Sequence, residues 1–501
     1  MNRGQTVLLY GYFAQVYGTV LSIAVSPLIL RAVGAETYGL VGLFLIAQAW
    51  FQLLDAGLTP ALTRETARFR GGAATGRSLR DTLRGLEALV ALLALPVLAS
   101  FWLGSTPIAT HWIRRDTLAI GEIVAALNFM GVILLLRWVS GIRRGVLGGF
   151  ERHGTLQSVN VAVATLRFPG ILWLFSWVAP SATSYFAWQL AISVLEAMAL
   201  WLFSRPLLPR ERAGRLAESL ASLRTIGAFA ANHAFLSLIW IVVTQTDKLI
   251  LSSLLDLANF GYLSLAVAAA AGVQLIVMPI SQVLMPKLAR LHAEQDPAAL
   301  LATYHRYTRL VVVFSCVTAA VFAAFGPAVM WAWTGDAKIV DAVGQVLAWY
   351  AVGNAALVIG AMSYYLQYAN GNLRLHTIGT MAFLIVVVPW LFWAVSRFGM
   401  LGASVTWAAV CIAYLLTWVT VTHRQLLAGA HWRWLLDDVL RIVVPVVVVA
   451  IALARLVPMP DARVASALVL IACGCVLMLT ALVASGLLQP WIKSVHTGRA
   501  S

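Results

Sequence analysis

Ionisable side chains are rare inside the long apolar stretches of this 501-residue sequence, so those that occur there are the first candidates for chemistry. Arg167 lies near the middle of the stretch 156–179, and Asp247 and Lys248 are neighbours in a later stretch. A charge in apolar surroundings is costly unless it is paired or meets an oppositely charged ligand. Two roles are therefore open for Arg167: binding of an anionic ligand, or an ion pair with Glu196.

Three carboxylates are candidates for coupling to a proton or a sodium ion: Asp55, Asp247 and Glu196. Asp55 could bind and release a proton, but its position just before Gly57 and Pro60 is equally typical of a helix break capped by a carboxylate. Adjacent positions on a helix do not face each other. Hence at most one of Asp247 and Lys248 is expected to point into a shared cavity.

The remaining polar residues of the apolar stretches point less directly to a site. Glu87, Glu122 and Arg137 lie toward the ends of their stretches, which favours an interfacial position for each. Amide side chains could bind sugar hydroxyl groups, although hydrogen bonds between helices are their commoner use. The amides concerned are Asn128, Asn160, Asn232, Gln245 and Gln274, and both uses stay open for them.

The elements that must position these residues are fourteen apolar stretches, each long enough to cross a bilayer. Hydrophobic residues make up 61% of the chain and charged residues 11%, and the mean hydropathy is +0.86. A hydrocarbon core about 30 Å thick needs roughly 20 helical residues per crossing, with every backbone group paired inside the segment. The sequence therefore predicts an all-α polytopic membrane protein with spans at 7–30, 38–62, 83–103, 118–140, 156–179, 182–204, 226–251, 259–286, 307–330, 343–368, 373–395, 400–422, 440–457 and 464–488.

The net charge is +15, but the placement of the charges argues against a nucleic-acid partner. Most of the 35 Lys and Arg residues fall in alternate links, and short links rich in Lys and Arg stay cytoplasmic, so both termini are expected in the cytoplasm. The densest links contain Arg64, Arg68, Arg70, Arg77, Arg80 and Arg84, and then Arg205, Arg210, Arg212, Arg215 and Arg224. Topology and attraction to anionic lipids account for these clusters without substrate contact.

The chain has none of the motifs that mark ATP-driven pumps, zinc proteases or serine hydrolases. Its four cysteines, Cys316, Cys411, Cys473 and Cys475, lie in apolar spans without metal-ligand spacing, so neither a metal nor another cofactor is predicted. The links on the non-cytoplasmic side are short, which disfavours an external active site, although helix ends could still assemble one. We therefore expect a carrier and not an enzyme.

An internal repeat indicates that the carrier has two related halves. A shift of 222 residues aligns the second span with the eighth without a gap, and the identical pairs include Gly39 with Gly261 and Arg68 with Arg290. The shift covers an even number of spans, so both halves run in the same direction. Two parallel six-helix lobes around a central cavity are predicted, with an N-terminal lobe at 1–204, a cytoplasmic linker at 205–225, a C-terminal lobe at 226–424, and two extra helices with a cytoplasmic tail at 425–501.

Arg68 and Arg290 occupy equivalent positions at the cytoplasmic ends of the second and eighth spans. Guanidinium groups bind phosphate oxygens in pairs, so these two could receive one diphosphate between them. Enforcement of the positive-inside orientation is the alternative. Together with Arg64, Lys248 and Arg167, they form the predicted set of substrate-binding residues.

Two groups of segments carry a family resemblance. The first group is Tyr38–Leu43, Leu54–Leu58 and Arg64–Arg68, and the second is Thr246–Ser252 with Phe260–Tyr262. Both resemble the signatures of Wzx-type polysaccharide (O-antigen) flippases of the multidrug/oligosaccharidyl-lipid/polysaccharide (MOP) exporter superfamily. The same superfamily contains lipid II flippases and multidrug exporters. The resemblance covers most of the chain up to residue 425.

The resemblance implies a flippase that moves undecaprenyl-diphosphate-linked oligosaccharide from the cytoplasmic to the periplasmic leaflet of the bacterial inner membrane by alternating access, for O-antigen or another surface polysaccharide. Membrane lipids and the polysaccharide polymerase and chain-length proteins are the implied partners. A lipid II-type or multidrug exporter is the nearest alternative, and a membrane polysaccharide polymerase or ligase is a more distant one. The arginines within spans favour an anionic cargo over the cationic ligands of drug exporters.

Overall fold

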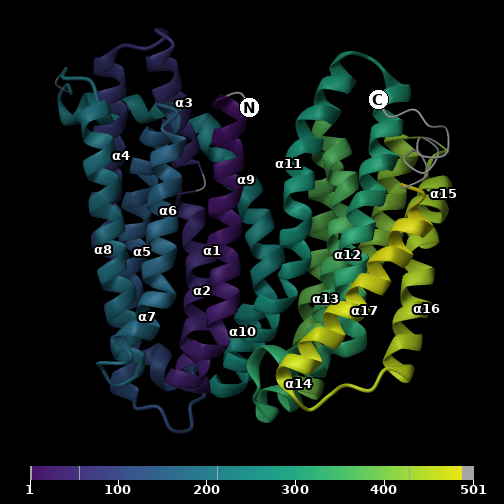
Figure 1. Ribbon diagram of the computed structural model, residues 1–501. Helices are drawn as coiled ribbons and strands as arrows, with labels where there is room; N and C mark the ends of the chain where they lie inside the picture. The colour runs from purple at the N-terminus through teal and green to yellow at the C-terminus, as the bar shows by residue number, and fades with distance from the viewer. Residues whose placement is uncertain (1–2, 56, 212, 428, 488–501) are drawn as a thin grey trace. The chain divides into compact units, whose positions relative to one another are not determined.

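The structure is a computed structural model that describes residues 3–55, 57–211, 213–427 and 429–487 (Figure 1). Within these ranges the chain is helical almost throughout and has no β-strand, only an isolated bridge between Arg114 and Asp256. The predicted all-α membrane fold is confirmed. The C-terminal tail from residue 488 lies outside the described residues.

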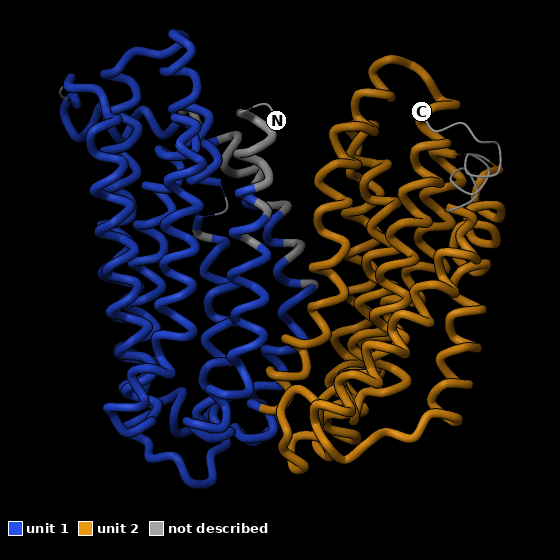
Figure 2. Tube along the Cα trace, viewed as in Figure 1, with its two compact units in different colours: residues 1–261 blue, residues 262–501 orange. Residues whose placement is uncertain are grey.

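Two compact units divide the chain between Gly261 and Tyr262 (Figure 2). The first unit contains α1 (Arg3–Val33), α2 (Ala35–Asp55), α3 (Leu58–Arg70), α4 (Gly76–Pro107), α5 (Ile120–Gly149), α6 (His153–Arg167), α7 (Pro169–Leu174), α8 (Ala182–Ser204), α9 (Leu216–Leu254) and the start of α10 (Leu257–Ala270). The predicted seventh span is thus in the same compact unit as the first six. The lobe boundary at 205–225 stays a prediction based on the repeat.

The second unit begins within α10 and contains the helices that follow it. They are α11 (Gly272–Ala293), α12 (Pro297–Thr334), α13 (Ala337–Ala369), α14 (Arg374–Leu426), α15 (His431–Arg433), α16 (Arg441–Leu456) and α17 (Arg463–Ser485). A π-helical segment, Trp434–Leu440, joins α15 to α16. The two extra helices predicted at the C-terminal end therefore correspond to α16, with the short segments before it, and α17.

The described ranges contain 10 helical segments that are long and apolar enough to cross a membrane, or 11 if the bent pair α2–α3 is one span. Helix α14 is one of these segments, but its 53 residues are more than twice the number of residues that one membrane crossing needs. Gly399 breaks it between two predicted spans, with a φ of 55° that favours glycine. Fourteen crossings remain a prediction with which the helices agree.

Helix caps explain where several spans begin and end. Ser181 and Ser184 form a reciprocal capping box at the start of α8, and the Asp296 carboxylate accepts a hydrogen bond from the Ala299 N–H at 2.9 Å at the start of α12. Gly335, with a φ of 57°, ends α12 in the left-handed conformation. The capping residues lie in the polar links between the predicted spans. Capping and the change in composition therefore mark the same helix boundaries.

Helix α5 positions the charged residues of the first unit. Its glycines lie against α3 so closely that a Cβ atom on Gly149 would be 2.7 Å from the Thr63 carbonyl oxygen, and one on Gly145 would be 3.0 Å from the Thr59 carbonyl oxygen. Glycine permits this close backbone approach. Helix α5 also contacts α2, α4 and α8. Side chains along α5 can therefore reach several helices of the unit.

The linker that was predicted at 205–225 is tied to the first turns of α4. The Asp81 carboxylate accepts hydrogen bonds from the Gly214 N–H at 2.7 Å and from Ser219 Oγ at 3.1 Å. Arg84 donates to the Gly214 carbonyl oxygen at 2.8 Å. An arginine that was assigned only to membrane topology therefore also fixes the linker.

Reporter fusions test the predicted topology. Because Lys and Arg gather in alternate links, reporters that require the cytoplasm should be active at 70–80, 210–220, 292–302 and the C-terminus. Reporters that require export should be active at 104–117 and 331–342 instead. Labelling of an introduced cysteine in the 205–224 link from the periplasmic side would contradict the fourteen-span topology.

Candidate functional site: an arginine cluster in the first compact unit

The Glu196 carboxylate is the centre of a charged cluster inside the first compact unit. Glu196 lies on α8 and is only 5% exposed. Arg167 Nη2, at the end of α6, lies 2.9 Å from Glu196 Oε2, and Arg144 of α5 binds the other carboxylate oxygen. Arg167 therefore forms an ion pair with Glu196, which is one of the two roles that the sequence left open for it. Arg144 binds the same carboxylate.

A polar strip along α6 extends this cluster. Arg144 Nη1 donates to Asn160 Oδ1 at 2.6 Å, and Asn160 Nδ2 donates to Gln157 Oε1 at 3.0 Å. Asn160 therefore makes an interhelical hydrogen bond, as the commoner use of such amides predicts. Arg144 was counted from the sequence as part of a cytoplasmic link, and its role in the cluster was missed.

Arg137 adds a third guanidinium group. It donates to Gln48 Oε1 on α2, and its guanidinium carbon lies 5.0 Å from the centre of the Phe44 ring. The sequence placed Arg137 toward the end of a span at 118–140, but α5 continues to Gly149, so Arg137 lies well inside the helix. The helix therefore continues 12 residues past Arg137, and an interfacial position for Arg137 stays a prediction.

Arg137 and Arg167 lie far along their helices from the turn that joins α5 and α6. Counted from that turn, Arg137 is about 18 Å along α5 and Arg167 about 21 Å along α6, at 1.5 Å per residue. With this turn at the cytoplasmic face, as the Lys and Arg pattern predicts, neither guanidinium group is expected to extend easily to that interface.

The cluster has an excess of positive charge. In the described part of the chain, Glu196 is the acidic residue that pairs with Arg144 and Arg167, and Arg137 has no acidic group within ion-pair distance. The Nε–H groups of Arg137 and Arg167 are buried without a hydrogen-bond partner. With two guanidinium groups on one carboxylate and the Arg137 guanidinium group on an amide and a ring, the cluster can stabilise a further anion through charge-assisted hydrogen bonds.

Asp55 ends α2 at the break before α3. Thr59 Oγ1 lies 2.7 and 2.9 Å from its two carboxylate oxygens, and the Asp55 side chain lies against Gly141 of α5. The position at a helix break agrees with the capping alternative. Its use as a proton-binding group stays a hypothesis.

Asp247 and Lys248 pair with each other on α9. Lys248 Nζ donates to Asp247 Oδ1 at 3.0 Å and to the Thr244 carbonyl oxygen at 2.6 Å. The long lysine side chain bends back along the helix, so neighbours that do not face each other still meet. Asp247 is 5% exposed, and the pair neutralises both charges within one helix.

The predicted cytoplasmic arginines lie at helix ends. Arg68 Nη1 is 3.0 Å from Glu65 Oε2 in the first unit, and Arg290 Nη1 is 3.5 Å from Glu294 Oε1 in the second. Their side chains are 52% and 65% exposed, and Arg64 is exposed as well. Exposed pairs of this kind contribute little to stability, so Arg68 and Arg290 can exchange these partners for a ligand. The diphosphate clamp stays a hypothesis.

Of the other predicted amides, Gln274 links two helices. Gln274 Nε2 donates to Asn354 Oδ1 at 3.2 Å, and Gln245 Nε2 lies 3.4 Å from Thr244 Oγ1. Asn128 Oδ1 is buried without a hydrogen-bond partner. The side chain of Asn232 lies outside the described residues.

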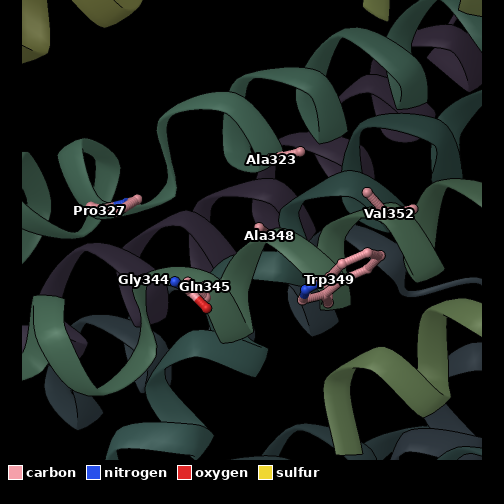
Figure 3. Close-up of a pocket in the computed structure, with 7 residues that line it drawn as sticks. All are labelled: Ala323, Pro327, Gly344, Gln345, Ala348, Trp349 and Val352. Atoms are coloured by element: carbon pink, nitrogen blue, oxygen red, sulfur yellow. The ribbon is translucent and has the colours of Figure 1, made fainter. Parts of the chain in front are cut away.

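A cavity of about 280 Å³ lies between α12 and α13, beside the kink of α12 at Phe325 (Figure 3). Its lining is apolar apart from a single amide, and consists of Ala323, Pro327, Gly344, Gln345, Ala348, Trp349 and Val352. A charged ligand would find no counter-charge there. The arginine cluster is therefore the better candidate for an anionic ligand.

The second unit contains a buried polar network that the sequence analysis missed. The Asp438 carboxylate is fully buried and binds Arg309 Nε at 2.7 Å and the imidazole of His305. Tyr304 Oη lies 2.8 Å from His423 Nε2. The network joins α12 to the segments before α16 across more than 100 residues of sequence. Only the spacing of His305 and Arg309, one helical turn apart, was a local signal of a shared partner.

Comparison with known proteins gives one family match over more than half of the chain. Residues 8–292, more than half of the chain, match the model of a family described as polysaccharide biosynthesis protein. A search of curated proteins gives no match.

Solved transporters share the fold. The lipid II flippase MurJ in an inward closed conformation has a TM-score of 0.75 at 12% identity, covering 97% of this chain and 99% of that chain. An inward-facing multidrug resistance MATE family transporter of the MOP superfamily has a TM-score of 0.67 at 14% identity, covering 82% and 94%. A MOP superfamily transporter from Pyrococcus furiosus, described by the reverse polarity of its binding pocket, has a TM-score of 0.54 at 14% identity, covering 83% and 94%. These neighbours are transporters and flippases, not enzymes.

A double-mutant cycle tests whether Glu196 and Arg167 are coupled. Glu196→Gln should lower the thermal unfolding midpoint of the purified protein because Arg144 and Arg167 lose their counter-charge, and Arg167→Gln should lower it because Glu196 loses one of its two ion pairs. The combined variant should lose less than the sum of both, with a coupling of roughly 0.5–3 kcal/mol. Arg143→Gln is the control, since Arg143 binds Glu87 instead. Additive losses for Glu196 and Arg167 would contradict the pair.

Proposed function

The chain belongs to the polysaccharide biosynthesis protein family, and we propose that it flips undecaprenyl-diphosphate-linked oligosaccharide from the cytoplasmic to the periplasmic leaflet of the bacterial inner membrane. Transport follows alternating access, in which a central site opens first to one face and then to the other. The product serves O-antigen or another surface polysaccharide. Membrane lipids surround the carrier, and the polymerase and chain-length proteins that use its product are its partners.

The observation that carries this proposal is the uncompensated positive charge around Glu196. Arg144 and Arg167 share one carboxylate, and Arg137 contacts Gln48 and the Phe44 ring, which leaves an excess of two positive charges, equal in magnitude to the charge of a diphosphate diester with one negative charge on each phosphate. The buried Nε–H groups of Arg137 and Arg167 supply donors that the protein does not use. Such donors bind phosphate oxygens strongly in surroundings without water.

The cargo chemistry fits a membrane carrier. A polyprenyl tail can remain in lipid during the movement, whereas a diphosphate and its sugars cannot enter hydrocarbon unaided. The cluster offers guanidinium groups for the diphosphate, and Gln48, Asn160 and Gln157 lie beside it as hydrogen-bonding groups for a sugar.

Glu196 offers a route to ion coupling. When a diphosphate binds Arg144 and Arg167, the Glu196 carboxylate loses its counter-charges and becomes able to bind a proton. Release of the cargo restores the ion pairs and expels the proton. Asp55 and Asp247 are alternative coupling residues, although Asp247 is already paired with Lys248.

The excess of arginines over carboxylates in the cluster disfavours a multidrug exporter, because binding of a cationic ligand requires an excess of carboxylates. A lipid II-type cargo is a second candidate, favoured by the likeness in fold to MurJ. The lipid II head group is also carried on a polyprenyl diphosphate. The two cargoes therefore differ in their sugars, and the same arginine cluster can bind the diphosphate of either.

Arg137 gives the sharpest test of cargo binding because it is not part of the Glu196 pairs. Arg137→Gln should abolish export of lipid-linked oligosaccharide in a strain that lacks the native gene, while the protein reaches normal membrane abundance. The reason is the loss of a buried cation that has no acidic partner. The measurement is accumulation of the lipid-linked oligosaccharide on the cytoplasmic side.

Arg143→Gln provides a matched control on the same helix, since Glu87 already neutralises Arg143. It should leave export near the wild-type rate. Binding of purified protein to undecaprenyl diphosphate, with undecaprenol as the uncharged control, should be lost only in the Arg137 variant. Normal export and binding by that variant would overturn the assignment of the cluster as the diphosphate site.

Replacement of Arg68 and Arg290 together by lysine separates the diphosphate clamp from topology. Lysine keeps the positive charge that orients the spans but lacks the planar fork that binds phosphate oxygens in pairs. The double variant should therefore insert normally and export poorly, with each single variant intermediate. Wild-type export at equal membrane abundance would assign both arginines to topology alone.

A further inference from the structure

Two buried histidines face each other in the polar network of the second compact unit. His423 lies in the last turn of α14 and His431 at the start of α15, and their Nδ1 atoms are 3.0 Å apart. His423 Nε2 lies 2.8 Å from Tyr304 Oη of α12, and His431 Nε2 lies 3.0 Å from Thr420 Oγ1 of α14. All four ring nitrogens of this histidine pair therefore have a polar partner.

The partners determine where each ring carries its proton. Thr420 has one hydroxyl hydrogen, which it donates to the Leu416 carbonyl oxygen at 2.6 Å, so His431 Nε2 must donate to Thr420 Oγ1. A neutral imidazole has one donor and one acceptor, so His431 Nδ1 accepts the hydrogen bond that His423 Nδ1 donates. His423 Nε2 in turn accepts the hydroxyl hydrogen of Tyr304. With both rings neutral, every group in this chain of hydrogen bonds has a partner.

A proton added to either ring breaks the chain. On His431 it would occupy Nδ1, where two N–H donors would then face each other without an acceptor. On His423 it would occupy Nε2 and turn the hydroxyl group of Tyr304, which is fully buried, away from its acceptor. A buried donor without an acceptor is costly. The intact chain therefore requires that both rings are neutral.

The charged groups around the histidine pair do not compensate an added proton. The buried Asp438 carboxylate is already bound by Arg309 Nε at 2.7 Å and by the imidazole of His305. A proton on His305 leaves this bond in place, because Nδ1 can donate in either state of the ring. Within the described part of the second unit, the titratable and charged groups that face the pair and its network are Tyr304, His305 and Arg309 of α12, Arg424 of α14 and Asp438 of the π-helical segment.

The histidine pair lies at the attachment of the segment 431–440, which leads into α16. Trp434 packs edge-on against the His423 ring, with 4.8 Å between the ring centroids, and its Nε1 donates to Thr308 Oγ1 of α12 at 3.1 Å. Asp438 follows one turn later and also binds α12. A few polar side chains thus fasten this segment to α12 and α14, and the histidine pair is one of these contacts.

We propose that the histidine pair is a pH-sensitive switch: with both rings neutral it fastens the segment 431–440 to α12 and α14, and a proton on either ring releases this segment. The pair lies in a link that is expected to face the cytoplasm, so the switch responds to cytoplasmic pH. The proposal goes beyond the proposed function, because it involves neither the cargo nor the arginine cluster.

The ordinary titration of imidazole sets the pH range of the switch. A released imidazole titrates near pH 6.5, roughly, whereas the fastened rings are neutral. The released state therefore binds more protons, so the fastened state is stable above about pH 7.5 and weakens as the pH falls through about 6.5. At about pH 5.5, one imidazole that must lose its proton shifts the equilibrium about tenfold toward release.

A buried cysteine measures this release. Val439 is 3% exposed, so Val439→Cys is shielded while the segment is fastened, whereas Leu436→Cys, at a position that is 54% exposed, reports the reactivity of the reagent at each pH. Each reporter is placed in a background with the four native cysteines replaced by alanine, and the purified protein is labelled with a maleimide. The ratio of the Val439→Cys rate to the Leu436→Cys rate should rise about tenfold from about pH 7.5 to about pH 5.5. A ratio that does not change with pH would overturn the switch.

Glutamine variants identify the responsible rings. His423→Gln should make the ratio independent of pH, because an amide can turn either its N–H group or its oxygen toward His431. His431→Gln removes the ring whose added proton meets a donor, so it should reduce the rise, and it serves if His423→Gln fails to fold. His305→Gln is the matched control in the same network and should keep the full rise, because the histidine pair is intact. A tenfold rise that persists in the folded His423 and His431 variants, or that is lost in the His305 variant, would refute the assignment to the pair.

Discussion

A charged side chain inside hydrocarbon must be neutralised by the protein or by a ligand, and the first compact unit is built around this constraint. Glu196 neutralises only part of the charge of Arg144 and Arg167, and Arg137 is held by an amide and an aromatic ring. The tight glycine contacts between α5 and α3 fix the helix that carries Arg137 and Arg144, and Glu196 holds Arg167 without help from a ligand. The site is therefore preorganised, and a ligand that binds it need not pay for ordering the side chains.

The sequence was sufficient to predict the helical fold, because bilayer thickness and backbone pairing leave few alternatives for so apolar a chain. It was also sufficient to predict that Arg167 needs a partner, and Glu196 was one of the two options. The repeat was visible as identical residues such as Gly39 and Gly261. That these two glycines cross each other's helices was not visible, because a repeat specifies equivalence and not contact.

Other parts of the site could not be predicted, for physical reasons. The apolar run ends near residue 140, but α5 continues to Gly149, so hydropathy marked an interface where the helix is still buried. The contacts of Arg137 with Gln48 and of Arg144 with Glu196 were missed for this reason. The network of Tyr304 and His423 joins residues 119 apart in sequence, and no local pattern specifies such a contact. Hydropathy reports the surroundings of a segment on average, whereas a site depends on single side chains from several helices.

The two halves have corresponding helices but differ in the charged residues that these helices carry. In the first, Arg137 of the fourth predicted span binds Gln48 of the second; in the second, Asn354 of the tenth span binds Gln274 of the eighth and accepts a hydrogen bond from Trp407 at 3.1 Å. The neutral network satisfies its own groups, whereas the cationic cluster leaves donors unused. A cargo with one diphosphate needs only one such cluster, and a second would add the cost of buried charge without a ligand to offset it. The asymmetry between the repeats is therefore what a carrier of a single anionic head group requires.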